Sequence, residues 1–374
     1  MITPAQLSEH QGYLADERRI AAYRAALAEI VQTGDVVLDL GAGTGILGYL
    51  ACEAGAKAVI AVDRSDILET ARRIAGDNGY RDRITHIKAL STEAVLETLV
   101  DVVVCDQIGG MVHDAGVLSA FADARMRLLA PGGRLVPSSF RIFTAPVSCP
   151  DVRARLEFWS SAPASIDVSA VRPLAANTEW MLNLTADEMV RLADETELAS
   201  FSSDHDAPIS GTVEFEAKSA GAFDGFVGWF EAQLSPTVTL TNNPWSPDRF
   251  NRWCNFYPID RAIDLAKGER ILLTLDIRPQ HRIVSWTIDL VDRPDMRQVR
   301  HSNFLTTSTS DLLSGTDPVP LNGNIGLTRT ILEMIDGTRT TKQIVEALSG
   351  EIGKSFVSGA HLESFVRKVT AVVR

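Results

Sequence analysis

Residues 36–56 read VVLDLGAGTGILGYLACEAGA, which predicts a buried strand, a glycine-rich turn and the start of a helix. The apolar residues Val36–Leu38 and Leu40 form the strand. Three glycines at alternate positions follow it: Gly41, Gly43 and Gly45. Glycine lets the backbone turn sharply and approach a ligand closely, so this turn predicts a site for a nucleotide-type ligand.

A second strand, AVIAVD (58–63), ends in an acid about 20 residues after the glycine turn. The carboxylate of Asp63 can accept hydrogen bonds from both hydroxyls of a ribose. A dinucleotide would use a similar turn, but the GxGxG spacing and the position of Asp39 inside the strand end favour S-adenosylmethionine. The remaining alternative is a tight structural turn without a ligand.

The chain around this turn alternates between predicted helices and strands. A helix is predicted over residues 16–32. Further strands are predicted at 84–88, 101–105 and 134–137, with LAPGG (129–133) as a turn before the last one. This alternation predicts an α/β fold with a doubly wound, Rossmann-like sheet.

Composition excludes several classes of protein. The net charge of −12 argues against general nucleic-acid binding, and no apolar run reaches the roughly 18 residues of a membrane span. The N-terminus lacks a signal-peptide pattern, so we expect a cytoplasmic protein. Four scattered cysteines predict neither disulfides nor a metal site. Residues 301–374 carry no net charge, which indicates a separate C-terminal module.

With these motifs, the sequence resembles the protein arginine methyltransferases over residues 8–300. Gly41 and Asp63 match the family's backbone and ribose contacts. The resemblance implies that Arg19 pairs with the methionine carboxylate of the cofactor and that His10 lies near the active site; the alternative for Arg19 is a solvated side chain. It also implies adenine contacts by two adjacent residues, Ser91 and Thr92, the second of which is usually Glu in the family.

The resemblance extends to an all-β second half. Four segments alternate polar and apolar residues with a period of two: 211–217, 224–234, 237–241 and 268–290. The resemblance implies that they form a β-barrel, the last segment being a hairpin. It also implies that residues 150–210 hold an arm through which two chains form a homodimer.

Residues 105–118 read CDQIGGMVHDAGVL and predict a flexible loop at the carboxyl end of a strand. In the resembled family this loop carries two Glu residues that clamp a guanidinium group. Here the first position is Asp106, one methylene shorter, and the second is Ala115. The family's Thr-His-Trp loop is also altered, to Asn251-Arg252-Trp253.

These departures predict an acceptor other than arginine, because a guanidinium group is a permanent planar cation that one carboxylate holds poorly. An α-amino group, with a pKa of about 7.7–8.0, has a usable neutral fraction in the cell. The catalytic candidates are Asp106, His113, Asp114 and His10, of which Asp106, with His113 or His10 as alternatives, would orient the amine and accept its proton. The alternatives are a strand-end cap for Asp106 and a half-exposed loop imidazole for His113.

The C-terminal residues predict a small helical unit after a polar linker at 302–318. The pattern ILEMIDGTRTTKQIVEAL (331–348) and a third helix at 358–373 resemble the winged-helix-like modules that bind leader segments of ribosomally made peptides, such as the D protein of pyrroloquinoline-quinone biosynthesis. The resemblance implies that residues 311–374 bind a leader as an added strand. Dimerisation or packing is the alternative.

We therefore predict a cofactor-binding domain at 1–137, a β-barrel domain at 138–300 and a peptide-recognition domain at 301–374. The predicted function is S-adenosylmethionine-dependent N-methylation of a peptide amine, such as the N-terminal α-amine of a natural-product precursor. A tethered leader would raise the local concentration of the acceptor. The rival hypotheses are a peptide arginine methyltransferase with an altered acid loop and an inactive peptide-binding scaffold.

Overall fold

The structure, a computed structural model, describes residues 2–205, 207–278, 283–302, 330–349 and 359–371. The chain divides into two compact units, Met1–Leu312 and Leu313–Arg374. The predicted polar linker at 302–318 lies outside the described residues except for Ser302. A division of the first unit at residue 137 stays a prediction.

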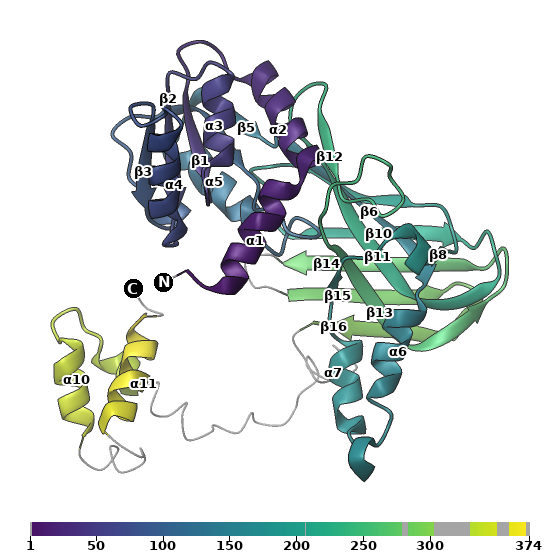
Figure 1. The fold of residues 1–374 in the computed structure, drawn as a ribbon. Coiled ribbons are helices and arrows are strands. Elements are labelled where there is room, and N and C mark those ends of the chain that lie inside the picture. The colour runs from purple at the N-terminus through teal and green to yellow at the C-terminus, as the bar shows by residue number, and fades with distance from the viewer. Residues whose placement is uncertain (1, 206, 279–282, 303–329, 350–358, 372–374) are drawn as a thin grey trace. The chain divides into compact units, whose positions relative to one another are not determined.

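A five-stranded parallel sheet forms the first part of the first unit (Figure 1). Its order is β3-β2-β1-β4-β5, and every neighbouring pair is parallel. Its strands are β1 (Val36–Leu40), β2 (Ala58–Asp63), β3 (Ile84–Lys88), β4 (Val100–Cys105) and β5 (Leu129–Val136). Helices α3 (Ile46–Glu53), α4 (Ile67–Asp77) and α5 (Val117–Arg127) connect strands along the chain. The predicted α/β fold with a Rossmann-like sheet is confirmed.

The prediction of a turn at residues 129–133 is wrong. Leu129 already pairs with Val100, and the same two strands pair again at Val102 and Arg134 after a shift of register. Gly132 has φ +78, which only glycine adopts readily. The Pro-Gly-Gly segment therefore bends within β5 instead of ending it.

Two helices precede the sheet, α1 (Pro4–Ala15) and α2 (Glu17–Ile30). A capping box between Thr3 and Gln6 starts α1, and the Asp16 carboxylate accepts a hydrogen bond from the Arg19 N–H at the start of α2. The predicted helix at 16–32 thus begins one residue later. The break at Asp16 separates His10 and Arg19 onto different helices.

Two antiparallel sheets form the rest of the first unit. One has the order β10-β14-β15-β16, and the path of the other is β7-β13-β11-β6-β8, with β12 on β11 and β9 on β6. Their strands are β6 (Ser139–Ser148), β7 (Trp180–Leu182), β8 (Val190–Arg191), β9 (Thr196–Ser202), β10 (Ile209–Glu216), β11 (Gly221–Gln233), β12 (Thr239–Thr241), β13 (Cys254–Leu265), β14 (Arg270–Arg278), β15 (Ile283–Leu290) and β16 (Arg293–His301). Closure into a β-barrel stays a prediction.

An insertion between β6 and β7 projects from these sheets (Figure 1). It contains α6 (Pro150–Phe158) and the short α7 (Arg172–Ala176), with single 3-10 turns at Pro163–Ser165 and Ser169–Val171. Arg153 on α6 donates to Asp224 on β11 at 2.9 Å, which anchors the insertion. Three large apolar side chains remain exposed on it: Phe158, Ile166 and Leu174.

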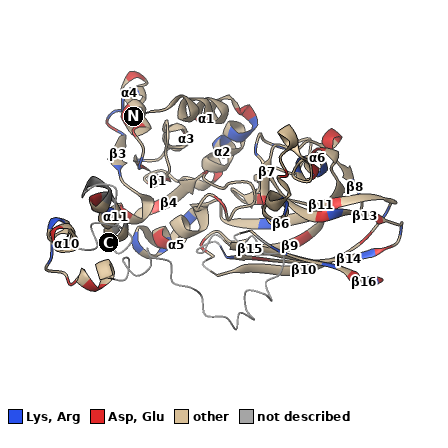
Figure 2. Cartoon of the chain, turned by 90° about the horizontal axis from the view of Figure 1, so that it is seen from below, with Lys and Arg blue, Asp and Glu red and all other residues tan. Residues whose placement is uncertain are grey.

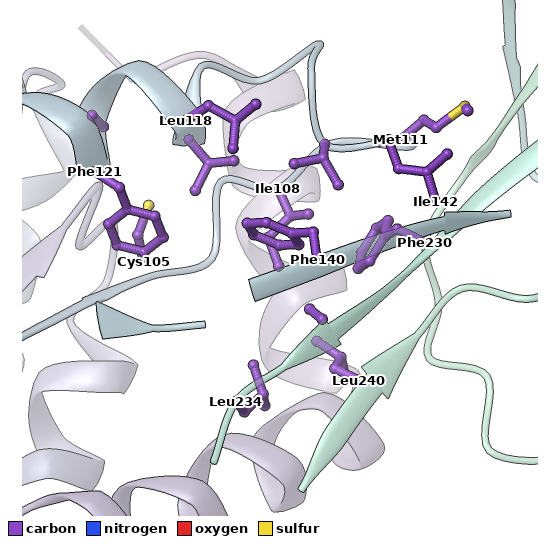
Figure 3. Close-up of a cluster of buried hydrophobic side chains, with 14 of the residues drawn as sticks. Cys105, Ile108, Met111, Leu118, Phe121, Phe140, Ile142, Phe230, Leu234 and Leu240 are labelled. Carbon is purple, nitrogen blue, oxygen red and sulfur yellow. The ribbon is translucent and has the colours of Figure 1, made fainter. Parts of the chain in front are cut away.

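One apolar core joins the parallel sheet to the antiparallel sheets. Figure 3 shows Ile108 and Met111, from the loop after β4, near Phe140 on β6 and Phe230 on β11. All four side chains are fully buried. The loop is therefore packed into the core along its apolar positions, unlike the flexible loop predicted from its glycines.

The second unit has a small core of its own. Helices α10 (Thr341–Leu348) and α11 (Gly359–Ala371) contribute buried residues, as does the short helical stretch at 330–334. The core consists of Ile331, Ile344, Leu348, Leu362 and Val366. Thr340 caps α10 with a capping box to Gln343. Its identity as a winged-helix-like domain stays a prediction.

Charged residues of both signs are interspersed along the described helices and strands (Figure 2). No described helix is long and apolar enough to cross a bilayer. The four cysteines, Cys52, Cys105, Cys149 and Cys254, are all buried free thiols.

Candidate active site

The candidate site lies where the parallel strand order reverses, between β1 and β4. Leu40 and Cys105 pair at the carboxyl ends of these neighbouring strands, so Gly41 and Asp106 follow side by side. A side chain at Gly41 would overlap Gln107 of the loop after β4. In open α/β sheets, this switch point is where ligands bind.

The glycine turn is held by the acid that ends β2. The Gly43 N–H donates to Asp63 Oδ2 at 2.9 Å, and the Ser65 N–H and hydroxyl donate to Asp63 Oδ1 at 2.7 and 2.6 Å. All three glycines, Gly41, Gly43 and Gly45, have positive φ. Each carboxylate oxygen has more than one lone pair, so Asp63 Oδ2 can still accept from a ribose hydroxyl.

Asp39 lies fully buried inside the same turn. Its Oδ2 accepts the Gly48 N–H at 3.0 Å, and its Oδ1 has no hydrogen-bond partner among the described residues. Burial raises the pKa of Asp39 to about 7, against the lowering effect of the Gly48 bond. This acid sits behind the glycine turn and supports its backbone at the start of α3.

Helices α1 and α2 contribute His10 and Arg19 to the site. A Cβ placed on Gly43 would lie 3.0 Å from His10 Cε1, so the imidazole of His10 lies against the glycine turn. Arg19 on α2 is 4% exposed and forms an ion pair with Asp106. Its Nη2 donates to the Tyr13 carbonyl oxygen at 2.8 Å, while its Nε is buried without a hydrogen-bond partner among the described residues.

These groups fit S-adenosylmethionine chemically. Gly41, Gly43 and Gly45 have no side chains, so a ligand can approach the backbone at these positions, and the Asp63 carboxylate suits ribose hydroxyls. The unpartnered Nε of Arg19 suits a carboxylate. Ser91 and Thr92 lie in the 3-10 turn Ser91–Glu93 after β3, where both carbonyl oxygens accept from Arg127.

Asp106 is surrounded by partners that sequence reasoning did not identify. Besides Arg19, Asp106 Oδ1 accepts the Tyr23 hydroxyl at 3.2 Å and lies 3.4 Å from Arg252 Nη2. The Tyr13 ring lies beside both arginines, with its centroid 5.3 Å from Arg19 Cζ and 5.2 Å from Arg252 Cζ. The site is thus one carboxylate between two guanidinium groups.

The structure pairs His113 with Glu179. Its Nε2 lies 3.1 Å from Glu179 Oε1, and Glu179 also accepts from Tyr257 Oη at 2.7 Å and from Asn255. The alternative of a half-exposed imidazole is wrong, because the His113 side chain is only 6% exposed. Glu179 lies in the irregular segment before β7. The pattern of apolar residues there does not indicate that this acid is the buried partner of His113.

Asp114 folds back on its own loop. Its carboxylate accepts the Gly110 N–H at 2.9 Å, so it closes the turn instead of facing Asp106. The neighbouring Val112 has φ +74, which is rare for a β-branched residue, and its side chain is fully buried. Such strain, about 1–3 kcal/mol, persists only where the surroundings hold it.

Comparisons with known proteins find methyltransferases. A protein-family model described as ribosomal protein L11 methyltransferase (PrmA) matches residues 24–140. Protein arginine N-methyltransferase 6 of Xenopus tropicalis is 28% identical over 297 residues, covering 74% of this chain and 87% of that protein. A probable protein arginine N-methyltransferase 6 of Arabidopsis thaliana is 30% identical over 244 residues, covering 62% of this chain and 55% of the relative.

Two solved structures share the fold. The Trypanosoma brucei PRMT1 enzyme-prozyme complex with AdoHcy superposes with a TM-score of 0.70 at 23% identity, over 78% of this chain and 97% of that one. Arabidopsis thaliana protein arginine methyltransferase 10 gives 0.66 at 19% identity, over 79% and 98%.

This chain is an S-adenosylmethionine-dependent methyltransferase. Its Rossmann-like sheet and the fold of its first unit are similar to those of the protein arginine methyltransferases. The hypothesis of an inactive scaffold is therefore set aside, and the acceptor is the open question about this methyltransferase.

Proposed function

We propose that this methyltransferase transfers a methyl group to an arginine nitrogen of a protein or peptide. The observation that carries the proposal is that Asp106, at the end of β4, already binds the guanidinium group of Arg252. The Tyr13 ring beside that contact completes a guanidinium-binding environment. The names of the relatives support the same acceptor, which the sequence had predicted only as a rival to a peptide amine.

The chemistry assigned to the chain's own residues is positioning and proton transfer. When bound, S-adenosylmethionine supplies an electrophilic methyl group. The acceptor nitrogen forms the C–N bond as the C–S bond breaks, the electron pair stays on sulfur, and the nitrogen loses a proton. We assign Asp106 to orient that nitrogen through a charge-assisted hydrogen bond and to take up the proton.

We assign the cofactor's groups to residues around the glycine turn. Asp63 would hold the ribose, Arg19 the methionine carboxylate, and Gly41, Gly43 and Gly45 the close backbone approach. Asp39 would hold the turn in shape from beneath, and His10 would cover it from α1. Ser91 and Thr92 would lie beside the adenine, because their turn follows β3 at the same edge of the sheet.

A peptide amine is the second candidate acceptor, and one observation favours it. Ala115 is exposed and supplies no second carboxylate, so a guanidinium group meets one acid instead of two. A neutral α-amine needs only one acceptor for its proton. This hypothesis keeps the same roles for Asp63, Arg19 and Asp106.

We also retain two expectations about partners. Residues 311–374, which include the second unit, would hold a peptide, and the small separate core of that unit supports a role apart from the catalytic unit. The exposed Phe158, Ile166 and Leu174 on the insertion would be covered in a homodimer, because large apolar side chains gathered on one projection favour a protein interface.

The test is methylation of three peptides of matched length. The first is N-acetylated with one arginine, the second N-acetylated with lysine in its place, and the third has a free N-terminus and neither residue. Release of S-adenosylhomocysteine is followed with each. We expect turnover with the arginine peptide. Turnover with the free-amine peptide alone would establish the second candidate instead.

A further inference from the structure

Arg252 binds Asp106, the residue to which the proposed function assigns the acceptor nitrogen. It precedes β13, and its Nη2 lies 3.4 Å from Asp106 Oδ1 and 3.3 Å from the Asp106 carbonyl oxygen. The Arg252 and Asp106 side chains are each 11% exposed. Salt screens such a sheltered pair much less than a surface pair. The contact is therefore part of the site.

The surroundings of Arg252 are those of a bound guanidinium ligand. Its Cζ lies 5.2 Å from the centroid of the Tyr13 ring and 5.4 Å from that of Phe250. Aromatic faces attract guanidinium groups, and a carboxylate orients them. The chain thus fills, with its own arginine, a place that has the chemistry to receive an arginine from elsewhere.

The single carboxylate of Asp106 cannot balance both Arg252 and a substrate guanidinium group. Asp106 carries one negative charge, and Arg19 and Arg252 carry two positive charges within its contact shell. A cofactor carboxylate on Arg19 would leave Asp106 balanced by Arg252. A further guanidinium group would then have no acid of its own, since Ala115 replaces the second one.

We propose that Arg252 is an internal occupant of the acceptor position and that a substrate arginine must displace it from Asp106. This inference rests on the proposed function. Arg252 then sets specificity, because the apparent affinity for any guanidinium ligand falls by the fraction of time that Asp106 is free. Binding of a single arginine with no flanking contacts is therefore weak. A peptide that makes further contacts with the protein can gain enough binding free energy to displace Arg252.

The test is Arg252→Gln in the full chain. Binding of the N-acetylated arginine peptide is measured by calorimetry with S-adenosylhomocysteine present, and KM and kcat are measured with S-adenosylmethionine. If Arg252 holds Asp106 for about nine-tenths of the time, Kd and KM for this peptide fall about tenfold. The kcat value stays within a few-fold, since Asp106 remains.

Two further variants keep the result interpretable. Arg18→Gln removes an arginine that donates to the carbonyl oxygens of Pro247 and Arg249 in the same loop but does not touch Asp106. It removes contacts to this loop while Arg252 stays in place beside Asp106, so its Kd should match the wild type. Arg252→Lys keeps the charge and should fall between the wild type and Arg252→Gln. Thermal unfolding shows that each variant folds.

The outcomes separate this inference from the function on which it rests. Unchanged or weaker binding of the arginine peptide by folded Arg252→Gln overturns the inference, as does equal tightening in Arg18→Gln. If the wild type and Arg252→Gln methylate only the free-amine peptide, the proposed function fails. The arginine-peptide Kd still decides whether Arg252 occupies a guanidinium position.

Discussion

His113 Nε2 lies 3.1 Å from Glu179 Oε1, although the two residues are 66 positions apart in the sequence. Burial alone would lower the pKa of His113, but the Glu179 carboxylate raises that pKa to about 9. The same His113 lowers the pKa of Glu179 against the effect of burial. A charged pair thus ties the loop that carries Asp106 to the segment before β7.

This pair predicts how stability depends on pH. The folded-state pKa of His113 lies above its unfolded value of about 6.5, so its contribution is complete below pH 6.5 and is lost as pH rises through 9. We expect a loss of about 3 kcal/mol of unfolding free energy over that range, because each pKa unit corresponds to about 1.4 kcal/mol. Chemical denaturation at several pH values measures it.

Comparison with His113→Gln shows whether this loss of unfolding free energy comes from His113. The variant should be less stable than the wild type at pH 6.5 and should lose less stability as the pH rises. Asp39, whose pKa burial raises to about 7, also destabilises the fold as pH rises through 7, but it does so equally in both proteins. Parallel curves for the two proteins up to pH 9.5 would refute the role of the pair.

Asp63→Ala should weaken S-adenosylmethionine binding by about 1–3 kcal/mol, because ribose hydroxyls lose a charged acceptor. Calorimetry on the full chain gives the affinity. Ser65→Ala is the matched control, because it removes a hydroxyl that donates to Asp63 at 2.6 Å but keeps the carboxylate. Equal affinity for the wild type and Asp63→Ala would remove Asp63 from the cofactor site.

Asp106→Asn should reduce kcat by about 10²–10⁴-fold, the usual contribution of a positioned acid–base group. The asparagine is nearly the same size but cannot accept the proton. Asp114→Asn, in the same loop, should retain most of the activity, because that carboxylate bonds the Gly110 N–H instead of facing Asp106. A larger loss of kcat in Asp114→Asn than in Asp106→Asn would reverse the assigned roles.

Much of the parallel sheet could be predicted from the sequence, because its strands are short apolar runs bounded by turns. Ile84–Lys88 was predicted at the same bounds, and Val100–Cys105 within one residue. The failure at residues 129–133 has a local cause, since Pro and two Gly residues usually end a strand but here bend one. Both the glycine turn and Asp106 follow strands, so their common edge was also predictable.

The contacts of the site were not predictable in the same way. Glu179 meets His113, and Tyr23 meets Asp106, only because distant segments fold together. Arg252 is visible in the sequence as a departure from the Thr-His-Trp loop of the resembled family. Its contact with Asp106, however, depends on where the segment before β13 lies. Periodicity reports which face of an element is buried and not which polar partner it meets.

Deletion of residues 313–374 should leave the unfolding temperature of the first unit and its cofactor affinity nearly unchanged, because the second unit has a separate core. If the second unit holds a peptide, the deletion should slow methylation of long substrates by about 10²-fold or more, and short peptides should be unaffected. Steady-state rates on both lengths measure the effect. Equal rates on long substrates would exclude a tethering role.

The central claim, that the acceptor is an arginine nitrogen, is tested most directly by one competition within a single peptide. A peptide with a free N-terminal amine and one internal arginine is incubated with the wild-type chain and S-adenosylmethionine, and fragmentation mass spectrometry locates the methyl group. We expect the methyl group on the arginine side chain, with more of it in Arg252→Gln. A methyl group found only on the N-terminal amine would contradict it.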